Sequence, residues 1–475
     1  MFKKNKANIF YISALTITII VLLYIFFTNL YFLRNKLTSV IFSLPIVEGK
    51  QNLDKDTAVK QQRKHEGFVK YYIDNFTDYK IDYYNLPLKN YFEYGDKPTA
   101  YVETYQDKII VSSGDGKFFF SKLENFSDIN INYTNISSNI KKVIDDRLFY
   151  KPGSRSIKDS LVHEDFLYLT YTKRLEKDCY NISVLRSKIN LEYLEFKEIF
   201  SPDECLKDNY RKQSGGRLHP FKENQFILTV GSFAHDSHAQ KDDNMFGKII
   251  VFSAGDNNYE ILSKGHRNPQ GLFYDEMSNV IINTEHGALG GDEININKLN
   301  EIEHTKNYGW PISSYGVHYG RITVEEAPLH NSHSEYGFIE PIKYFNPAIG
   351  ISQLIIQNEY EGKYKNFLVT SLGHGVNEGG DMSIHLIKFD QNYESIISHD
   401  LIPVGERIRD IVKIRDDSYL MVFESVPALA IMRKKDKICS KINPPCDFNQ
   451  TYEKSIYKDG IRQGNERFMY NSLMP

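Results

Sequence analysis

The sequence is poor in cysteine and tryptophan, and neither sign of charge dominates it. Its 475 residues include four cysteines and one tryptophan, and 58 lysines and arginines against 61 aspartates and glutamates leave a net charge of −3. Because there is no basic surplus, we expect no nucleic-acid partner and no electrostatic attachment to anionic lipid. The cysteine spacing contains no C-x-x-C pair, which argues against a thiolate zinc site.

Amphipathic helical patterns are also scarce, whereas residues that favour strands are abundant. The chain has 33 tyrosines and 30 phenylalanines, and aromatic side chains suit half-buried strands. Hydrophobic residues make up 41% and charged residues 25%, an ordinary balance for a globular protein. This length is compatible with one large all-β domain, because such domains often run to several hundred residues.

The amino-terminal segment predicts a membrane anchor. Three lysines within the first six residues precede an uncharged run at 9–33, and Arg34 and Lys36 follow it. A run of this length can cross a bilayer as a helix. It is longer than the apolar part of a signal peptide and lacks a small-residue cleavage site, so a cleaved signal is the less favoured alternative. We therefore predict a cytoplasmic tail at 1–8, a transmembrane helix at 9–33 and a periplasmic or extracellular remainder, which makes the membrane a partner of the chain.

The cysteines form an even set, which is compatible with disulfides in an oxidising compartment. They are Cys179, Cys205, Cys439 and Cys446. The short loop between Cys439 and Cys446 could close as one disulfide. Four free thiols are the alternative, and spacing alone does not decide the pairing.

The region after the anchor divides into three parts. Residues 34–95 are predicted to be a linker and lead-in, since 51–65 is polar without an apolar period. Residues 96–437 carry short strand-like runs separated by turn residues, and 438–475 form a carboxy-terminal extension. Predicted strands cover 108–112, 117–122, 166–172, 181–186, 225–230, 248–253, 279–284, 366–371, 383–389 and 418–423. Their loose repetition favours a β-propeller, with tandem β-sandwiches as the alternative.

Four glycine-containing or arginine-containing segments are chemically suggestive. They are G-G-R-L at 215–218, H-R-N-P-Q-G-L at 266–272, T-E-H-G-A-L-G-G-D-E-I-N at 284–295 with N-Y-G-W-P at 307–311, and G-E-R-I-R-D at 405–410. In the third segment, glycines beside Asp292 and Glu293 can present oxygens to calcium, or the segment is an ordinary turn. Arg407 and Arg409 share one face of a strand and can grip carboxylates, or they belong to a salt-bridged outer strand.

In this order the segments resemble the soluble quinoprotein glucose/sorbosone dehydrogenase family over residues 153–423. The strings R-N-P-Q-G, E-H-G-x-x-G-G-D-E-I-N and N-Y-G-W-P carry the resemblance. It implies a six-bladed β-propeller that holds pyrroloquinoline quinone (PQQ) at one end of its axis, with calcium beside it. It also implies that a histidine takes the proton of a sugar hydroxyl while a hydride passes to the quinone.

The resemblance assigns roles to individual positions. Arg267 and Asn268 match a cofactor-contacting pair, and Arg407 and Arg409 match two arginines that hold the carboxylates of the quinone. For calcium, the matching positions are the backbone carbonyls of Gly287 and Ala288 together with Glu293 and Tyr308.

Other positions depart from the family pattern, and the departures fall on catalysis. The family base corresponds to Gln213, whose amide cannot accept a proton near neutral pH. Loss of a general base costs ~10²- to 10⁴-fold in rate. The family lysine that meets the quinone corresponds to Gly373, followed by His374, and a cofactor-contacting glutamine corresponds to Ser154.

Two functions are therefore open. The first is a membrane-anchored oxidoreductase of the quinoprotein type that acts on a sugar or related alcohol outside the cytoplasm, and we favour it because the four arginine and asparagine positions suit an anionic cofactor. The catalytic residue is unknown, and the candidates for a substitute base are His219, His235, His238 and His374. The second is a catalytically silent propeller that binds a carbohydrate or protein partner through the same axial pocket.

Overall fold

A computed structural model describes most of the predicted propeller. The described residues are 79–88, 99–127, 131–144, 157–176, 179–207, 213–301, 305–319, 325, 327–358, 364–373, 379–415, 418–424, 428–434, 451–458 and 461–469. All belong to one compact unit, Glu66–Pro475. The predicted tail and anchor at 1–33, Cys439 and Cys446 lie outside them. In the part of the chain that the structure describes, no helix has the length and apolar character needed to span a membrane.

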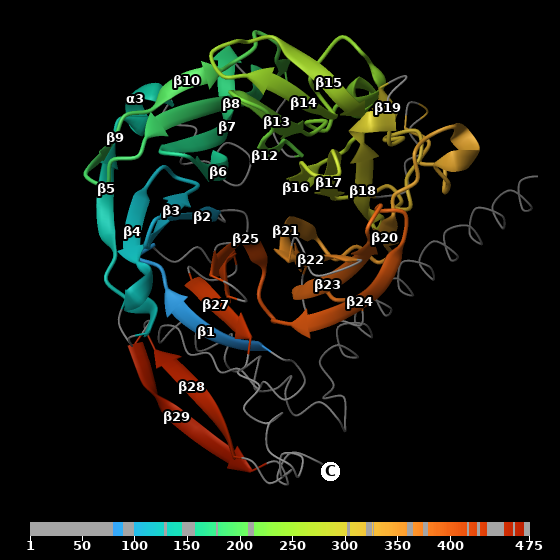
Figure 1. The fold of residues 1–475 in the computed structure, drawn as a ribbon. Helices are drawn as coiled ribbons and strands as arrows, with labels where there is room; N and C mark the ends of the chain where they lie inside the picture. Colours follow the sequence, from blue (N-terminus) through green and yellow to red (C-terminus); the bar gives the residue numbers. More distant parts are fainter. Residues whose placement is uncertain are drawn as a thin grey trace, which may run out of the picture. The chain divides into compact units, whose positions relative to one another are not determined.

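Six antiparallel sheets surround a common axis, which confirms the predicted six-bladed β-propeller (Figure 1). Each sheet runs from an innermost strand at the axis to an outer strand at the rim. In that direction the first three are β2 (Ala100–Tyr105), β3 (Lys108–Ser113), β4 (Phe118–Lys122), β5 (Thr134–Ser138) and β9 (Tyr193–Leu194); β6 (Ile157–His163), β7 (Phe166–Glu176), β8 (Cys179–Lys188) and β10 (Lys197–Phe200), with β11 (Leu206–Lys207) also on β8; and β12 (Gly215–Pro220), β13 (Gln225–Val230), β14 (Lys248–Ser253), β15 (Tyr259–Lys264) and β19 (Lys306–Asn307). Two short outer strands are parallel to their neighbours: β9 pairs with β5, and β19 pairs with β15.

The other three sheets follow the same plan. They are β16 (Pro269–Asp275), β17 (Val280–Glu285), β18 (Asp292–Lys298) and β20 (Lys343–Phe345); β21 (Ile351–Asn358), β22 (Tyr364–Ser371), β23 (Ser383–Asp390) and β24 (Ile396–Pro403); and β25 (Ile408–Arg415), β26 (Ser418–Phe423), β27 (Ala428–Lys434) and β1 (Tyr79–Asn85). Helical turns are short: α3 (Ile140–Val143), η1 (Leu123–Ser127), η2 (Asp236–Gln240), η3 (Leu299–Glu301) and η4 (Ser334–Tyr336). A hairpin, β28 (Thr451–Lys458) and β29 (Ile461–Met469), follows the propeller in sequence.

The ring closes through a strand from the beginning of the domain. β1 pairs antiparallel with β27, from Tyr79 opposite Lys434 to Asn85 opposite Ala428, so it forms the outer strand of the last sheet. β1 lies within the predicted linker and lead-in at 34–95, so the propeller begins earlier than the sequence predicted.

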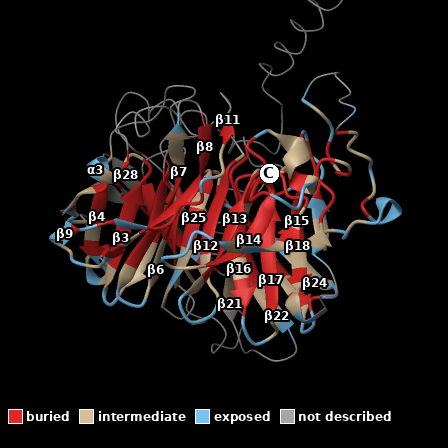
Figure 2. Cartoon of the chain, turned by 90° about the horizontal axis from the view of Figure 1, so that it is seen from above, coloured by how far each residue is buried: buried red, intermediate tan, exposed pale blue. Residues whose placement is uncertain are grey.

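The hydrophobic core lies between neighbouring sheets (Figure 2). Middle strands are buried on both faces because each sheet packs against a neighbour on either side; β13, with the sequence QFILTV, is buried at five of its six positions. The inner strands β2, β6, β12, β16, β21 and β25 contact one another in that order around the axis, and β25 contacts β2. Since each sheet starts at its inner strand, the starts of these strands meet at one end of the axis.

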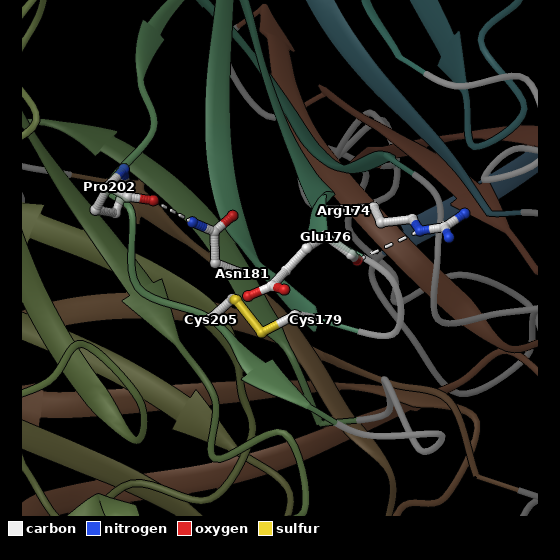
Figure 3. The surroundings of a disulfide bond; sticks show 6 residues. All are labelled: Arg174, Glu176, Cys179, Asn181, Pro202 and Cys205. Atoms are coloured by element: carbon white, nitrogen blue, oxygen red, sulfur yellow. Dashed lines mark hydrogen bonds between the residues drawn. A yellow bond between two sulfur atoms is a disulfide. The ribbon is translucent and has the colours of Figure 1, made fainter.

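One disulfide joins Cys179, at the start of β8, to Cys205, beside β11 (Figure 3). Their Cα atoms are 5.3 Å apart, and β11 pairs with the first residues of β8. Asn181 in β8 donates a hydrogen bond of 2.7 Å to the carbonyl of Pro202, which also holds the segment before β11 against β8. The disulfide therefore fixes the beginning of the segment that leads to Gln213.

Candidate functional site at one end of the propeller axis

The predicted cofactor residues come together where the inner strands begin. Asn268 immediately precedes β16 and accepts a hydrogen bond of 3.2 Å from the backbone N–H of Gly215, the first residue of β12. Gln270 donates to the same Asn268 oxygen at 3.0 Å and accepts from Arg409 of β25 at 2.9 Å. The sheets of β12, β16 and β25 are thus connected through polar side chains at this end of the axis.

A buried arginine anchors these strands. Arg217 of β12 donates to Asp159 of β6 at 2.7 Å and to Asp410 of β25 at 2.9 Å. It also donates to the carbonyls of Gln270, at 2.7 Å, and Arg409, at 2.8 Å. Because Arg217 is only 3% exposed and every contact is internal, we interpret it as a residue that fixes the backbone of Arg409.

Arg407 and Arg409 share one carboxylate. Arg407 donates from Nε at 3.0 Å and from Nη2 at 2.7 Å to Oε2 of Glu424, and Arg409 donates at 3.2 and 2.6 Å to Oε1. The remaining terminal nitrogen of Arg407 donates to the carbonyl of Gly373. Burial acts to raise the pKa of Glu424, but the charges of Arg409 and Arg407 win and lower it to about 2. The three side chains carry a net charge of +1.

Arg267 is a further cation, and not all of its N–H donors are hydrogen-bonded within the described residues. Its Nη1 donates to the carbonyl of His286 at 3.1 Å and to that of Gly287. Its guanidinium lies 5.2 Å from the ring centre of Trp310. No described residue accepts a hydrogen bond from the buried Nε of Arg267. Arg409 uses three of its five N–H donors in the contacts above. These donors fit an anionic, multicarboxylate ligand such as PQQ.

Lys158 of β6 lies near this group. A Cβ atom added to Gly216 would be 2.4 Å from Cβ of Lys158, so β12 passes beside the lysine, and the left-handed backbone of Gly216, with φ of +113°, also requires glycine. Burial, with the charge of Arg409, lowers the pKa of Lys158 to about 7, against the opposing effect of Glu424.

Gln213 is held in place by its neighbours. Its backbone has φ of +60°, its carbonyl accepts from the N–H of Phe233 at 3.0 Å, and its side-chain oxygen accepts from the hydroxyl of Ser232 at 3.1 Å. The backbone N–H of Ser232 in turn donates to the carbonyl of Arg267 at 2.8 Å. Ser232 thus links the side chain of Gln213 to the backbone of Arg267.

The space beside Gly373 is taken by another side chain. A Cβ atom added at Gly373 would fall 0.8 Å from Oδ1 of Asp381. Any side chain at residue 373, including a lysine, would have to displace that carboxylate. His374 and Ser154 lie outside the described residues.

The three described candidate bases differ in position. His219 lies within β12, where its Nδ1 is 2.7 Å from the carbonyl of Pro220 and its ring packs against Phe273. Burial lowers the pKa of His219 to about 4, so we assign it to packing. His235 and His238 flank the start of η2, with ring centres 5.9 Å apart, a few residues after Ser232.

The residues predicted to bind calcium lie close together, but the oxygen of each already contacts another group of the protein. Gly287, Glu293 and Tyr308 line a cavity of about 10 Å³. The carbonyl of Gly287 accepts from Arg267, and that of Ala288 from the hydroxyl of Tyr319 at 3.0 Å. The hydroxyl of Tyr308 donates to the carbonyl of Ile296 at 2.8 Å.

The fourth predicted ligand also has a protein partner. Glu293 Oε1 lies 3.2 Å from Nε2 of His333. Ca²⁺ requires six to eight oxygen ligands, so this arrangement does not fit it. Calcium binding at these residues stays a prediction.

The sequence comparison decides the family. Residues 156–433 match the family model described as Glucose / Sorbosone dehydrogenase. The chain belongs to the glucose/sorbosone dehydrogenase family.

Two relatives in sequence agree with this assignment. An uncharacterized protein of Synechocystis is 34% identical over 270 residues, which cover 52% of this chain and 61% of that protein. Aldose sugar dehydrogenase YliI of Escherichia coli is 29% identical over 221 residues, which cover 44% of this chain and 56% of that enzyme. The chain thus spans about 60% of the length of these two relatives.

Two solved structures share the fold. The soluble aldose sugar dehydrogenase of E. coli, in its apo form, has a TM-score of 0.54 at 18% identity and covers 75% of this chain and all of its own, 100%. The PQQ-bound aldose sugar dehydrogenase of Streptomyces coelicolor has a TM-score of 0.51 at 15% identity and covers 74% of this chain and 98% of its own.

Four residues of this candidate site were not predicted from the sequence. Glu424, Asp381, Lys158 and His333 lie outside the sequence motifs that carry the family resemblance, and each is identified by a contact or charge that only the folded chain provides. Glu424 could have been suspected, because two arginines two residues apart, with side chains only 19% and 11% exposed, need a nearby anion. No comparable signal pointed to the other three.

Proposed function

We propose that this protein is a quinoprotein-type oxidoreductase that uses PQQ to oxidise a sugar or related alcohol. The observation that carries the proposal is the group of arginines at one end of the axis, where Arg267 and Arg409 retain N–H donors for an anion. Arg267, Asn268, Arg407 and Arg409 would hold the cofactor. When bound, the quinone supplies an acceptor for the hydride that an alcohol carbon loses on oxidation.

The other half of the reaction needs a group that takes the hydroxyl proton. Gln213 stands where the family has its histidine, and a carboxamide cannot serve. We therefore expect the wild-type protein to bind PQQ and to oxidise sugars slowly.

The alternative function is a propeller that binds a carbohydrate or protein without turnover. Two observations favour it: the amide at Gln213, and the carboxylate of Asp381 in the space that a lysine at residue 373 would need. Arginines already satisfied in part by Glu424 are also compatible with a structural role.

Absorbance titration of the purified full-length protein with PQQ separates the two functions. We expect saturable binding that is lost when Arg407→Ala and Arg409→Ala are combined. Arg433→Ala is the control, because Arg433 on β27 pairs with Asp82 at 2.8 Å, away from the axial site. Failure of the wild type to bind PQQ would leave the silent propeller as the better account.

We also propose that a helix at 9–33 anchors the protein with the propeller outside the cytoplasm. The uncharged run and the disulfide between Cys179 and Cys205 support this, because disulfides persist in oxidising compartments. Fractionation should recover the intact protein in membranes, and external protease should cleave the propeller in intact cells. Recovery in the soluble fraction would contradict the anchor.

A further inference from the structure

Two buried carboxylates face the small cavity beside the glycine-rich loop. Glu285 and Glu293 are 3% and 6% exposed, and their strands β17 and β18 pair with these two residues directly opposite each other. The cavity of about 10 Å³ has room for about one water molecule. Carboxylates buried in this way require partners, because an unpaired buried charge is costly.

Glu285 obtains its partners from neighbouring residues. It accepts from the backbone N–H of Arg267 at 2.9 Å and from the amide of Asn295 at 2.8 Å, and the ring of His266 lies 3.2 Å away. Glu285 therefore has little capacity left for a metal ion.

Glu293 faces an imidazole. Nε2 of His333 lies 3.2 Å from Oε1 of Glu293, and His333 is 1% exposed. Ser313 is 3.0 Å from Nδ1 on the other side of the ring, and the ring of Tyr315 packs at 5.2 Å. These contacts fix the orientation of the imidazole toward the carboxylate.

The loop is shaped to admit this histidine. Gly309, from the N-Y-G-W-P string, has φ of +89°, and a Cβ atom added there would lie 2.0 Å from the hydroxyl of Ser313 and 2.8 Å from Nδ1 of His333. A side chain at Gly309 would displace both. The position of His333 thus depends on a residue far from it in the chain.

A cationic side chain occupies the carbonyl side of the same cavity. The guanidinium of Arg267 donates to the carbonyl of Gly287. Arg267 and His333 both line the cavity. Arg267 and His333, two basic side chains, therefore contact the Gly287 carbonyl and the Glu293 carboxylate, which are two of the predicted calcium ligands.

We propose that His333, together with Arg267, replaces calcium in this chain and makes this part of the propeller independent of metal. His333 is a positioning residue: it holds Glu293, and through the paired strands it holds the loop that contacts Arg267. The proposal depends on the family resemblance for where calcium would bind, and it does not depend on PQQ or on turnover.

Thermal unfolding of the full-length protein in calcium and in chelator tests the proposal. We expect the wild-type Tm to be the same in both. His333→Ala should lower the Tm in chelator and should gain a calcium-dependent rise of a few degrees, because a ligand that binds only the folded state stabilises it. Combining His333→Ala with Glu293→Gln should abolish that rise.

His330→Ala is the matched control, because His330 lies in the same loop and stacks on Tyr336 at 3.9 Å, outside the residues that line the cavity. It should show no response to calcium. If His333→Ala does not fold, His333→Gln replaces it. A wild-type Tm that falls in chelator would overturn the proposal, and so would a folded residue-333 variant that gains no response to calcium.

Discussion

Glu424 offers the most direct test of how the axial arginines are held. It follows β26, its side chain is 5% exposed, and each of its oxygens accepts two hydrogen bonds from one arginine. Glu424→Gln keeps the shape but removes the charge, and the amide nitrogen must then face one of the two arginines. We expect the substitution to destabilise the protein and to loosen Arg407 and Arg409.

The magnitude follows from the pKa of Glu424, which falls from 4.5 to about 2. That difference of about 2.5 units corresponds to ~3 kcal/mol of stability. Since the folded-state pKa is lowered, this stability is present above about pH 4.5 and is lost as the pH falls through 2. For residues 79–434, with ~2.1 cal/mol/K of unfolding entropy per residue, ~3 kcal/mol lowers the Tm by about 4 °C.

Calorimetry between pH 7 and pH 2.5 measures this effect. The difference in Tm between wild type and Glu424→Gln should be constant above about pH 5 and should shrink below it. Glu394→Gln is the control, because Glu394 is 68% exposed and its contact with Lys298 is 3.5 Å long, so its removal should have little effect. A difference that does not change with pH, or that equals the control at pH 7, would refute the reasoning.

Two further substitutions test stability and chemistry. Replacing Cys179 and Cys205 together by serine removes a crosslink with a sequence separation of 26 and should lower the free energy of unfolding by about 3.5 kcal/mol. Urea unfolding of the oxidised wild type and the variant measures this difference. An unchanged midpoint would contradict this expectation. Gln213→His restores the family base beside Ser232 and should raise the rate of PQQ-dependent sugar oxidation ~10²-fold or more, measured by dye reduction; fast oxidation by the wild type would instead show that another residue already serves as the base.

The fold was predictable from the sequence because the middle strands of each sheet are apolar. All ten predicted strands are confirmed, and 225–230, 248–253 and 418–423 match the observed bounds of β13, β14 and β26. Inner strands were mostly missed. β6 (IKDSLVH) and β12 (GGRLHP) mix charged, polar and apolar residues because one face packs in the core while the other meets the axis.

The candidate site was predictable only in part, for a different reason. Arg267, Asn268, Arg407 and Arg409 could be identified because each lies in a short contiguous motif, next to the residues that form the backbone turn. The partner that sets the charge of Arg407 and Arg409 comes from the end of the next strand, β26, and not from their own motif. Glu424 neutralises one arginine of the pair, and the motif around residue 407 does not include it.

The way in which β1 closes the ring limits how the protein can be shortened and when it can finish folding. The last sheet holds three strands from the end of the propeller and one from its beginning, and the ladder between β1 and β27 joins the two parts. A truncation that starts after Tyr79 removes part of the closing strand and exposes the edge of β27. During synthesis, the sixth sheet cannot be completed until residue 434 has been made, so the propeller closes as a late, long-range event.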